Sequence, residues 1–491
     1  MNPVVVMAVT TTEHTEGRVS TDHHPKQKSV EKNRTQSDYE FGGPVGVLLI
    51  ILWSHYILLY LWYCLERNNG SLVLPLTKDD LVYHLNQFRT LFLAQGIPSM
   101  KTWLAYMSFA AMQLLLAAFM PGITMFGLPT QPDGKRLIYL CNGYSCYYTC
   151  ILTFFTVHYM GIFDVTHICK EFGQYLTVSI IFGDATSLFW YFYGLYSTDP
   201  LNQVFHKTGL FIYDFFMGTI LYPRLGIVDI KMVAEARWSW LTLILLTLSC
   251  GIQQYETTGK VSKEMMMMIL AHWLYSNATV KGEHCIPSTW DMFHERLGWM
   301  LNFWNVTGVP FMYCFQSFYI LKNNISISLP HAFMSYFLLL LGYYIFDSAN
   351  AQKANSKIRI KRDLFPQVPW AYLENPKYLK TPKGNLLIDG WYAYARKMQY
   401  TGDIMMAFSW GLICGFNSIL PYFYLTFFLL MILHRQSRDE VKCKEKYGEY
   451  WDQYVHIVPN VFLPSSLFYS MLVNEIKKVM GFQFKPCSHQ D

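Results

Sequence analysis

The sequence predicts an all-α, polytopic membrane protein with about ten transmembrane helices, some of them short or broken. Composition is the first observation behind this fold class. Hydrophobic residues make up 52% of the 491-residue chain and aromatic residues 17%, whereas charged residues make up only 15%. Soluble proteins carry roughly 25% charged residues. The second observation is that the apolar residues are gathered in runs, as in chains that cross a bilayer several times.

A polar segment comes first in the chain. The first 38 residues contain Lys26, Lys28, Lys32 and Arg34 and have no apolar core. They lack the hydrophobic centre of a secretory signal, and their composition predicts a disordered cytosolic tail. We expect transmembrane helices with pocket-lining segments at 39–347. The remainder, 348–491, is expected to hold a cytosolic basic loop, a hydrophobic hairpin and a juxtamembrane helix.

The apolar runs mark the candidate spans. Several are shorter than the roughly 20 residues that a helix needs to cross about 30 Å of hydrocarbon. Short or interrupted helices are tolerated where they line a cavity enclosed by protein, so the pattern predicts helices around such a cavity. The candidates are 44–64, 103–119, 144–163, 174–196, 210–222, 240–255, 265–275, 300–321, 331–346 and a hairpin at 404–433.

Basic residues set the expected topology. The loop that follows 331–346 and the segment that follows Leu433 are both rich in Lys and Arg, and such segments usually face the cytosol. The chain between them must therefore cross the membrane an even number of times, which fits one hairpin. The cations of the loop are Lys353, Lys357, Arg359, Lys361, Arg362, Lys377, Lys380 and Lys383.

Several kinds of function are disfavoured. The net charge of +5 is concentrated in the loops, and no nucleic-acid-binding motif accompanies it. The 11 cysteines include no CxxC pair, which argues against a disulfide framework or a metal site. Neither a GxGxxG turn that opens a βαβ unit nor a GxxxxGK loop is present. A nucleotide would therefore have to be bound by another arrangement.

The segment 433–454 continues from an apolar run, so we expect one helix to leave the bilayer and extend into water. At about 100° per residue, one side of this helix carries Arg435, Arg438, Asp439, Lys442 and Lys446. Such a face suits anchoring at an anionic membrane surface, and it equally suits an anionic ligand. Lys353 and Lys357 share a helix face in the same way, and their ammonium groups could pair with phosphates.

Two blocks near the C-terminus carry a specific pattern, LLIDGWYAYARKMQYTGD at 386–403 and LHRQSRDEVKCKEKYGEYWDQY at 433–454. The matched positions are Gly390, Trp391, Ala395, Arg396, Gln399, Tyr400, Gly402, Asp403, 421–424, His434, Arg435, Arg438, Asp439, Cys443, 446–448, Trp451 and Tyr454. This pattern resembles the sterol reductase family, which includes the C14, Δ7 and C24(28) sterol reductases and the lamin B receptor. The phrases at 41–44, 270–293 and 415–424 are most similar to the fungal Δ24(24(1))- or C24(28)-sterol reductases.

The resemblance implies an NADPH site at 348–491, next to a cavity for a sterol. The positions that match the family's cofactor residues are Lys353, Lys357, Leu387, Tyr392, Gln399, Tyr400, Asp439, Cys443, Lys446, Tyr447 and Tyr454. Three depart from the wider pattern, because Lys357 replaces an Arg, Tyr392 a Trp and Gln399 an Asn. Lysine lacks the bidentate fork of arginine, whereas glutamine keeps the amide of asparagine.

A second group of candidate residues lies in the middle of the chain. Tyr275 aligns with a tyrosine in the pocket of related reductases. Asp291 and Glu295 are acidic residues inside apolar, aromatic sequence, and such residues are functional candidates by default. The alternative is a structural ion pair, for instance between a carboxylate and Arg224 or Arg296.

The resemblance implies NADPH-dependent reduction of the C24(28) double bond of a methylene sterol, the last step of ergosterol biosynthesis. An isolated alkene accepts a nicotinamide hydride only after protonation, so an acid must face the double bond in a site closed to water. We expect Tyr275 to donate the proton, assisted by Arg435 and Asp439. Asp291 and Glu295 are the alternative donors.

The resemblance further implies a sterol substrate within the lipid bilayer and an endoplasmic reticulum membrane location with both termini cytosolic. Reduction at C14 or Δ7 stays open, since these enzymes share the cofactor half. An isoprenylcysteine-type membrane methyltransferase has a similar C-terminal region but is a much smaller protein. A non-catalytic sterol-binding protein such as the lamin B receptor would be expected to carry a folded N-terminal module.

Overall fold

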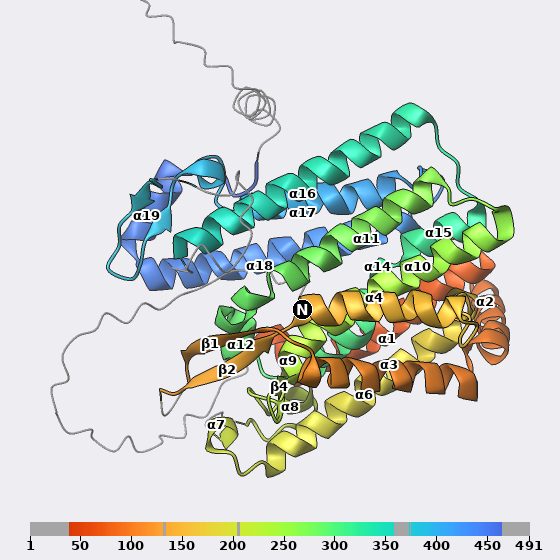
Figure 1. The fold of residues 1–491 in the computed structure, drawn as a ribbon, viewed down its shortest axis with the longest axis horizontal. Coiled ribbons are helices and arrows are strands. Elements are labelled where there is room, and N and C mark those ends of the chain that lie inside the picture. Colours follow the sequence, from red (N-terminus) through yellow and green to blue (C-terminus); the bar gives the residue numbers. More distant parts are fainter. Residues whose placement is uncertain (1–38, 131–133, 204–206, 358–372, 374, 464–491) are drawn as a thin grey trace, which may run out of the picture. The chain divides into compact units, whose positions relative to one another are not determined.

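A computed structural model describes residues 39–130, 134–203, 207–357, 373 and 375–463, and it is mainly helical, as predicted (Figure 1). The chain divides into two compact units. The first contains the described residues of Met1–Leu339 together with Ala407–Phe428, and the second those of Leu340–Met406 and Leu429–Asp491. The expected tail at 1–38 lies outside the described residues, as do Arg359, Lys361 and Arg362 of the basic loop.

The first unit holds most of the helices. In chain order its elements are α1 (Gly43–Arg67), α2 (Lys78–Leu91), α3 (Met100–Phe119), β1 (Ile123–Pro129), β2 (Arg136–Cys141), α4 (Gly143–Tyr159), α5 (His167–Lys170), α6 (Phe172–Tyr196), α7 (Pro200–Gln203), α8 (Phe211–Met217), β3 (Arg224–Leu225), β4 (Val228–Asp229), α9 (Ile230–Met232), α10 (Ser239–Thr258), α11 (Lys263–Lys281), α12 (Trp290–His294), α13 (Trp299–Phe303), α14 (Val309–Tyr313) and α15 (Phe315–Asn323).

Local sequence signals explain several helix ends. Ser99 and Ser262 accept hydrogen bonds from backbone N–H groups three residues ahead and so cap α3 and α11. The α10 helix ends at Gly259, whose φ of +73° places it in the left-handed region. Glycine adopts this conformation with little strain because it has no Cβ.

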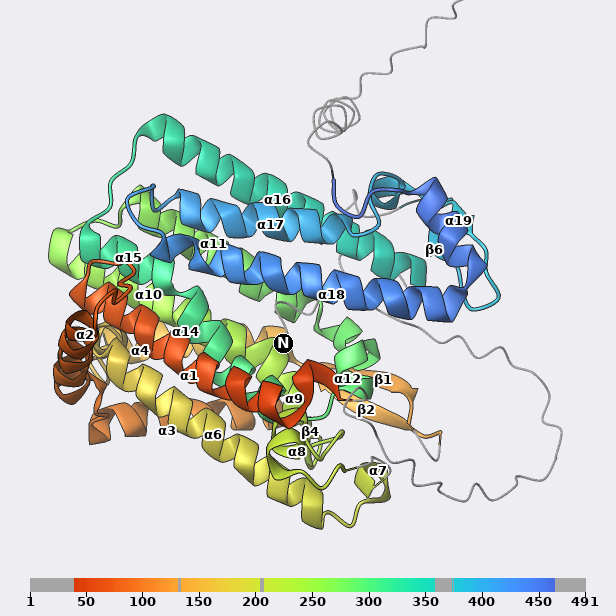
Figure 2. The same cartoon turned by 180° about the vertical axis from the view of Figure 1, so that it is seen from behind.

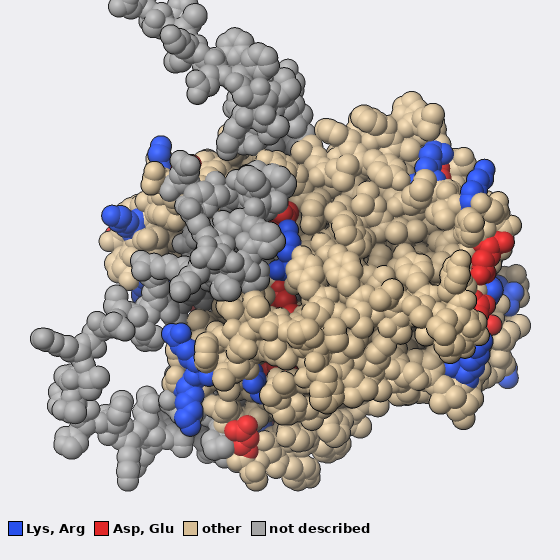
Figure 3. All heavy atoms as spheres, viewed as in Figure 1, with Lys and Arg blue, Asp and Glu red and all other residues tan. Residues whose placement is uncertain are grey.

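Three helical stretches of the described residues are long and apolar enough to cross a membrane: Glu40–Arg67, Met100–Phe119 and Leu329–Lys353. They match the expected spans at 44–64, 103–119 and 331–346. On the face shown in Figure 3, the middle parts of α4 and α11 display no Lys, Arg, Asp or Glu, and charged side chains gather near helix ends. The total of about ten crossing helices remains a prediction.

Two expected spans are broken. The run at 300–321 forms α13, a π-helical segment η6 (Trp304–Gly308), α14 and α15 in succession. Pro310 lies near the start of α14, where its missing N–H interrupts the regular hydrogen-bond pattern. In the run at 210–222, only α8 is helical, because Gly218 ends the helix with a φ of +90°.

Three short antiparallel sheets depart from the predicted all-α fold class. The longest pairs β1 with β2, with Ile123 opposite Cys141 and Phe126 opposite Ile138; the others pair β3 with β4 and β5 (Tyr378–Leu379) with β6 (Leu386–Leu387). The residues of β1 and β2 are apolar and partly β-branched or aromatic, a composition that suits strands. The prediction was wrong here because 123–141 was treated as a connection between spans.

A partly exposed polar contact joins α1 and α6, which lie side by side in the first unit (Figure 2). His55 Nε2 on α1 lies 3.0 Å from Asp184 Oδ2 on α6. The other carboxylate oxygen of Asp184 accepts a hydrogen bond of 2.7 Å from the Trp299 indole N–H on α13. One carboxylate therefore ties three helices together.

The second unit consists of the C-terminal part of α16 (Leu329–Lys357), β5, β6, the turn η9 (Gly390–Ala393), the first part of α17 (Met398–Leu412), the second part of α18 (Phe423–Tyr447), and α19 (Glu449–Ile457). Its core contains Ile345, Ala349, Leu387, Trp391, Tyr392, Ala395 and Met398. The α16 and α17 helices approach closely at Gly342 and Gly402. A Cβ added to Gly402 would lie 2.6 Å from the Gly342 carbonyl oxygen.

We predict that Gly402→Ala lowers the melting temperature of the purified protein. The new methyl group would overlap a backbone atom, which cannot move as a side chain can, and such overpacking costs about 1–3 kcal/mol. Gly251→Ala on α10 is the matched control, since its added Cβ would meet only the terminal methyl of Ile269 at 2.8 Å. If Gly402→Ala, like its control, melts at or above the wild-type temperature, the close packing of α16 on α17 is contradicted.

Candidate functional site

All eleven predicted cofactor residues belong to the second unit. They come from six elements, which lie in two stretches of the chain at 353–400 and 439–454. Lys353 and Lys357 are on α16, Leu387 on β6, Tyr392 on η9, Gln399 and Tyr400 on α17, Asp439, Cys443, Lys446 and Tyr447 on α18, and Tyr454 on α19. Lys357 is the last residue of α16, and its side chain lies outside the described part.

A buried ion pair connects the start of α17 to α18. Lys397 is only 7% exposed, and its ammonium donates to Asp439 Oδ2. Burial opposes the charge on Asp439, but the Lys397 ammonium, with smaller contributions from Lys353 and Arg435, holds the pKa of that carboxyl at about 2. Asp439 is therefore an ionised hydrogen-bond acceptor at neutral pH and is not a proton donor.

Hydrogen bonds from α16 hold the turn η9 in place. The Trp391 indole N–H donates to Ser348 Oγ at 2.6 Å, and the Trp391 backbone N–H donates to Gln352 Oε1 at 2.9 Å. The next side chain, Tyr392, donates its hydroxyl to Gln399 Oε1 at 3.1 Å. Two predicted cofactor residues thus contact each other directly, and Lys353 Nζ lies 5.9 Å from the centre of the Tyr392 ring.

Aromatic side chains and one lysine gather where α18 meets α19. The Trp451 ring lies 6.3 Å from that of Tyr447 and 5.2 Å from that of Tyr454, and Cys443 packs in the same cluster. Burial raises the pKa of both tyrosines to about 12, so both phenols are neutral near pH 7. Lys446 Nζ stands 4.9 Å from the Tyr447 ring centre.

Arg396 fixes the chain that follows α19. Its guanidinium donates to the backbone carbonyls of Val458 at 2.7 Å and Pro459 at 2.8 Å. In addition, the Arg396 and Lys397 backbone N–H groups donate to the carbonyls of Asn460 and Val461. The second unit therefore combines cations, a fixed carboxylate, an amide and flat aromatic faces, which together can bind an anionic ligand that contains aromatic rings.

The predicted proton donor lies in the first unit. Tyr275 on α11 is buried, with its ring 4.9 Å from that of Trp240 and 5.5 Å from that of Trp410. Tyr424 continues this aromatic enclosure, with its ring 4.8 Å from Trp410 and 4.3 Å from Tyr313. These rings surround the Tyr275 side chain, which is 1% exposed. Arg435 and Asp439 belong to the second unit, so their assistance to Tyr275 remains a prediction.

Asp291 and Glu295 are placed around a buried lysine. The Lys231 ammonium donates to the backbone carbonyl of Asp291 at 2.9 Å and to that of Glu295 at 3.0 Å. Arg224 pairs with the carboxylate of Asp229, at 3.5 Å, and a structural ion pair of Asp291 or Glu295 remains a prediction. The role of Asp291 or Glu295 as a donor remains a prediction.

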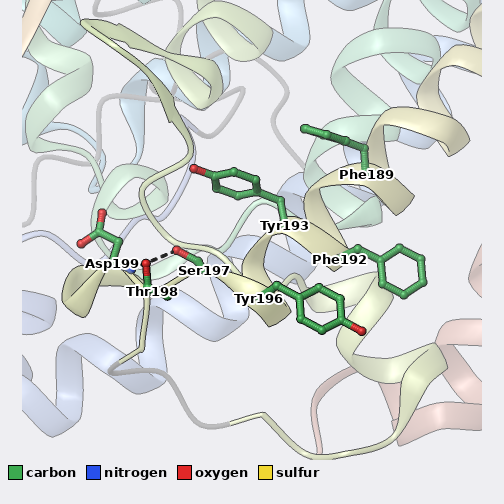
Figure 4. A pocket seen from close by; sticks show the side chains of 7 residues that line it. All are labelled: Phe189, Phe192, Tyr193, Tyr196, Ser197, Thr198 and Asp199. Atoms are coloured by element: carbon green, nitrogen blue, oxygen red, sulfur yellow. Dashed lines mark hydrogen bonds between the residues drawn. The ribbon is translucent and has the colours of Figure 1, made fainter.

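A surface pocket of about 490 Å³ lies at the C-terminal end of α6 (Figure 4). Aromatic side chains, among them Phe189, Tyr193 and Tyr196, form one side, and Ser197, Thr198 and Asp199 follow them. None of the predicted cofactor or catalytic residues lines it. The enclosed cavity expected from the sequence remains a prediction.

Lys397 is the residue of this site that sequence reasoning missed. It follows Arg396 at the end of an aromatic segment, where a lysine is easily explained as a cytosolic flank of the next helix. The available signal was the carboxylate at Asp439 on a face otherwise made of cations. A buried carboxylate needs a partner, and Lys397 is the cation that provides it.

Comparison with known proteins identifies the family. The family model described as "Ergosterol biosynthesis ERG4/ERG24 family" matches residues 35–467. The chain belongs to this family. The family membership predicted from the C-terminal blocks is thereby confirmed.

Individual relatives share much of the chain. A Delta(24(24(1)))-sterol reductase of Gibberella zeae is 37% identical over 440 residues, which cover 87% of this chain and 73% of the relative. A protein of the same name from Aspergillus fumigatus is 36% identical over 453 residues, 88% of this chain and 93% of the relative. A Delta(14)-sterol reductase of Methylotuvimicrobium alcaliphilum is 35% identical over 430 residues, which cover 87% of this chain and 95% of the relative.

We predict that Lys397→Met lowers the melting temperature strongly, because it removes the main partner of the largely enclosed Asp439 carboxylate. Removing one member of a buried ion pair costs about 3–5 kcal/mol. The double variant Lys397→Met/Asp439→Leu should regain much of that loss, since no unpaired charge remains. If the double variant melts no higher than Lys397→Met, the ion pair does not organise this unit.

The pH dependence of the same variants has a defined sign. Folding lowers the pKa of Asp439 from 3.8 to about 2. The resulting stabilisation is complete above the higher value and is lost as the pH falls through the lower one. Near neutral pH the stabilisation from Asp439 is therefore complete, and the wild-type melting temperature should not change with pH on account of this group. In Lys397→Met the pKa of Asp439 rises. Acidification from neutral pH should therefore reduce the difference in melting temperature between this variant and the wild type.

Proposed function

We propose that this protein catalyses the NADPH-dependent reduction of the C24(28) double bond of a methylene sterol. Two similar relatives named Delta(24(24(1)))-sterol reductase support this choice of double bond. The observation that carries the proposal is the convergence of all eleven expected cofactor positions in one compact unit. Six elements contribute these positions, and their grouping in one unit supports a shared site.

The residues of the second unit suit NADPH. Lys353 and Lys446 are cations that can pair with its phosphates. Asp439, fixed as a carboxylate by Lys397, can accept hydrogen bonds from a ribose hydroxyl or an amide N–H. Tyr447 and Tyr454 offer ring faces, and the Gln399 amide offers both a donor and an acceptor. When bound, NADPH supplies the hydride that completes the reduction.

The proton is assigned to Tyr275. Protonation of the terminal CH2 carbon of a 24(28)-methylene sterol leaves a tertiary cation at C24. Trp240 and Trp410, whose rings lie against Tyr275, can stabilise such a cation through their ring faces and keep water away from it. A free phenol is a weak acid, with a reference pKa of about 10, so Tyr275 needs a source of protons behind it.

The membrane supplies the substrate in this proposal. The three long apolar helices support a multi-pass protein, and a sterol dissolves in the same bilayer. We place the protein in the endoplasmic reticulum membrane with both termini in the cytosol, on the basis of the basic loop and the basic segment after Leu433.

Reduction at C14 is the second candidate function. The Delta(14)-sterol reductase of Methylotuvimicrobium alcaliphilum, at 35% identity, favours it. The family assignment removes the methyltransferase alternative considered for the C-terminal blocks. Product analysis separates the two reductases, since each would consume a different sterol.

We predict that the purified protein oxidises NADPH when given a 24(28)-methylene sterol and that gas chromatography detects the saturated side chain. Tyr275→Phe should lower kcat about 10²-fold or more, because a general acid contributes typically 10²- to 10⁴-fold. NADPH affinity should stay unchanged. Tyr148→Phe is the control, since the Tyr148 hydroxyl binds Asn277 at an exposed site. Full turnover by Tyr275→Phe would eliminate the assignment, and consumption of a 14-ene sterol alone would favour the second candidate.

We predict that Lys446→Gln weakens NADPH binding about tenfold, since hydrogen bonds to charged groups contribute about 1.5–3 kcal/mol. Lys444→Gln removes the same charge from the same helix at a largely exposed position, where Lys444 pairs with Asp452 at 3.2 Å, and should leave affinity unchanged. Titration of each variant with NADPH by calorimetry gives the comparison. If both variants lose NADPH affinity equally, the effect is one of overall charge, and Lys446 makes no specific contact with NADPH.

A further inference from the structure

One buried carboxyl group of the first unit has no role in the function proposed so far. Glu235 lies in the π-helical segment η4 (Val233–Trp238) and is 1% exposed. Neither of its carboxyl oxygens has a hydrogen-bond partner among the described residues. An ionised carboxylate in such a place is strongly destabilised, and the neutral acid is favoured.

The nearest buried cation cannot offer Glu235 a hydrogen bond. Lys231 is 0% exposed, and its ammonium donates to the carbonyls of Asp291, Met292 and Glu295 at 2.9, 3.1 and 3.0 Å. An ammonium group has three protons to donate. All three ammonium protons of Lys231 are therefore directed at backbone oxygens. Lys231 acts on Glu235 only through its charge and not through a hydrogen bond.

The count of buried charges also favours a neutral Glu235. Asp229 has its own stabilising contacts, a hydrogen bond of 3.1 Å from the Met232 backbone N–H and the Arg224 guanidinium at 3.5 Å. Asp291 is buried near the same lysine. Of the three carboxyl groups, Glu235 is the one with both oxygens fully buried and without a hydrogen-bond partner among the described residues, so it is the one that keeps its proton.

Other titratable groups of the neighbouring elements are already engaged or uncharged. Arg237, on η4 itself, pairs with Glu283 at 2.7 Å. Glu295 follows α12 and takes part in the Lys231 arrangement through its carbonyl. The remaining neighbours that can titrate are neutral near pH 7 by residue type: Tyr106 on α3, Cys146 and Tyr147 on α4, and Tyr275 on α11.

Further polar groups without a partner lie around Glu235 and Tyr275. The η4 segment packs against the π-helical segment η6, where Trp304 Nε1 and Asn305 Nδ2 have no hydrogen-bond partner among the described residues. The same holds for Trp410 Nε1, on a ring that contacts Tyr275. Buried groups of this kind bind water or a ligand, and π-helical segments are frequent at functional sites.

The chain connects Glu235 to the Tyr275 enclosure. The η4 segment continues directly into α10, and Trp240, five residues after Glu235, places its ring 4.9 Å from that of Tyr275. The η4 segment also packs against α11, the helix that carries Tyr275. Water bound at the buried polar groups would connect the two side chains.

We propose that Glu235 is an internal acid that returns a proton to Tyr275 through water bound at the polar groups of η4 and η6. This inference rests on the proposed sterol reduction. In each turnover the π bond of the alkene breaks and two C–H bonds form, one with the proton from Tyr275 and one with the hydride of NADPH. Glu235 then gives its proton to the Tyr275 phenolate, and the resulting carboxylate takes up one proton from water.

Glu235 acts through Tyr275 and is therefore a positioning residue that supplies protons. Infrared difference spectroscopy of the wild type near neutral pH should show the C=O stretch of a protonated, buried carboxylic acid. Glu235→Gln should remove this band. The variant should also melt at the wild-type temperature, since a neutral amide replaces a neutral acid of the same shape. Loss of the band in Asp291→Asn but not in Glu235→Gln would assign the proton to Asp291 and overturn the proposal.

The kinetic test uses steady-state turnover of the same variants. Glu235→Gln should lower kcat about 10²-fold, leave KM for the sterol and NADPH affinity unchanged, and make kcat fall about tenfold for each unit of rising pH, because protons must then come from solvent. Glu235→Asp should restore part of the rate. Glu256→Gln, an exposed glutamate at the end of α10, is the control that keeps wild-type kcat.

The outcomes separate this inference from the proposed function. If the wild type reduces no sterol with NADPH, the proposed function fails, whatever the infrared result for Glu235. If the wild type is active and Glu235→Gln keeps its kcat and pH profile, Glu235 supplies no protons. A rise in KM with unchanged kcat would likewise show a merely structural role.

Discussion

The ion pair between Lys397 and Asp439 is the interaction on which the second unit depends. It joins residues that are 42 positions apart and lie at the start of α17 and within α18. Neither charge is tolerated there without the other, because burial disfavours each alone. With α17 and α18 fixed in this way, Gln399 and Tyr400 on one helix and Cys443 on the other belong to one compact unit.

A second layer of contacts extends from this pair. Arg396, adjacent to Lys397, binds the carbonyls of Val458 and Pro459 and so holds the chain that leaves α19. Trp391 binds α16 through Ser348 and Gln352. The ligand-binding side chains are therefore held by groups that themselves have no direct contact with a ligand in our proposal. Such support is what keeps a polar site ordered.

The charged face of 433–454 could be predicted from sequence, because the period of an α-helix places its cations and Asp439 on one side. The cofactor residues assigned there follow from the family resemblance and remain a prediction. Lys397 could not be found in this way, since a lysine before a helix is common and only packing shows that it is buried. The β1–β2 hairpin was missed for a related reason. Its apolar residues resemble those of a short helix, and periodicity alone does not separate the two.

The first unit contains several buried acidic groups, each of which must be stabilised away from water. Asp229 and Glu283 are each held by hydrogen bonds or a cation. By contrast, neither carboxyl oxygen of Glu235 has a hydrogen-bond partner among the described residues, and Glu235 lies where a regular helix gives way to a π-helical segment. Asp291 and Glu295 became candidates because they are acidic residues within apolar, aromatic sequence. The structure shows that their backbone carbonyls, which a sequence cannot indicate, hold Lys231.

The most direct test of the account is hydrogen–deuterium exchange of the detergent-purified protein with and without NADPH. We expect NADPH to slow exchange of backbone amides at 387–400 and 439–454, the two segments that carry most of the assigned cofactor residues. Lys397→Met should weaken this protection. Protection confined to segments of the first unit, or none at saturating NADPH, would contradict the assignment of the cofactor site.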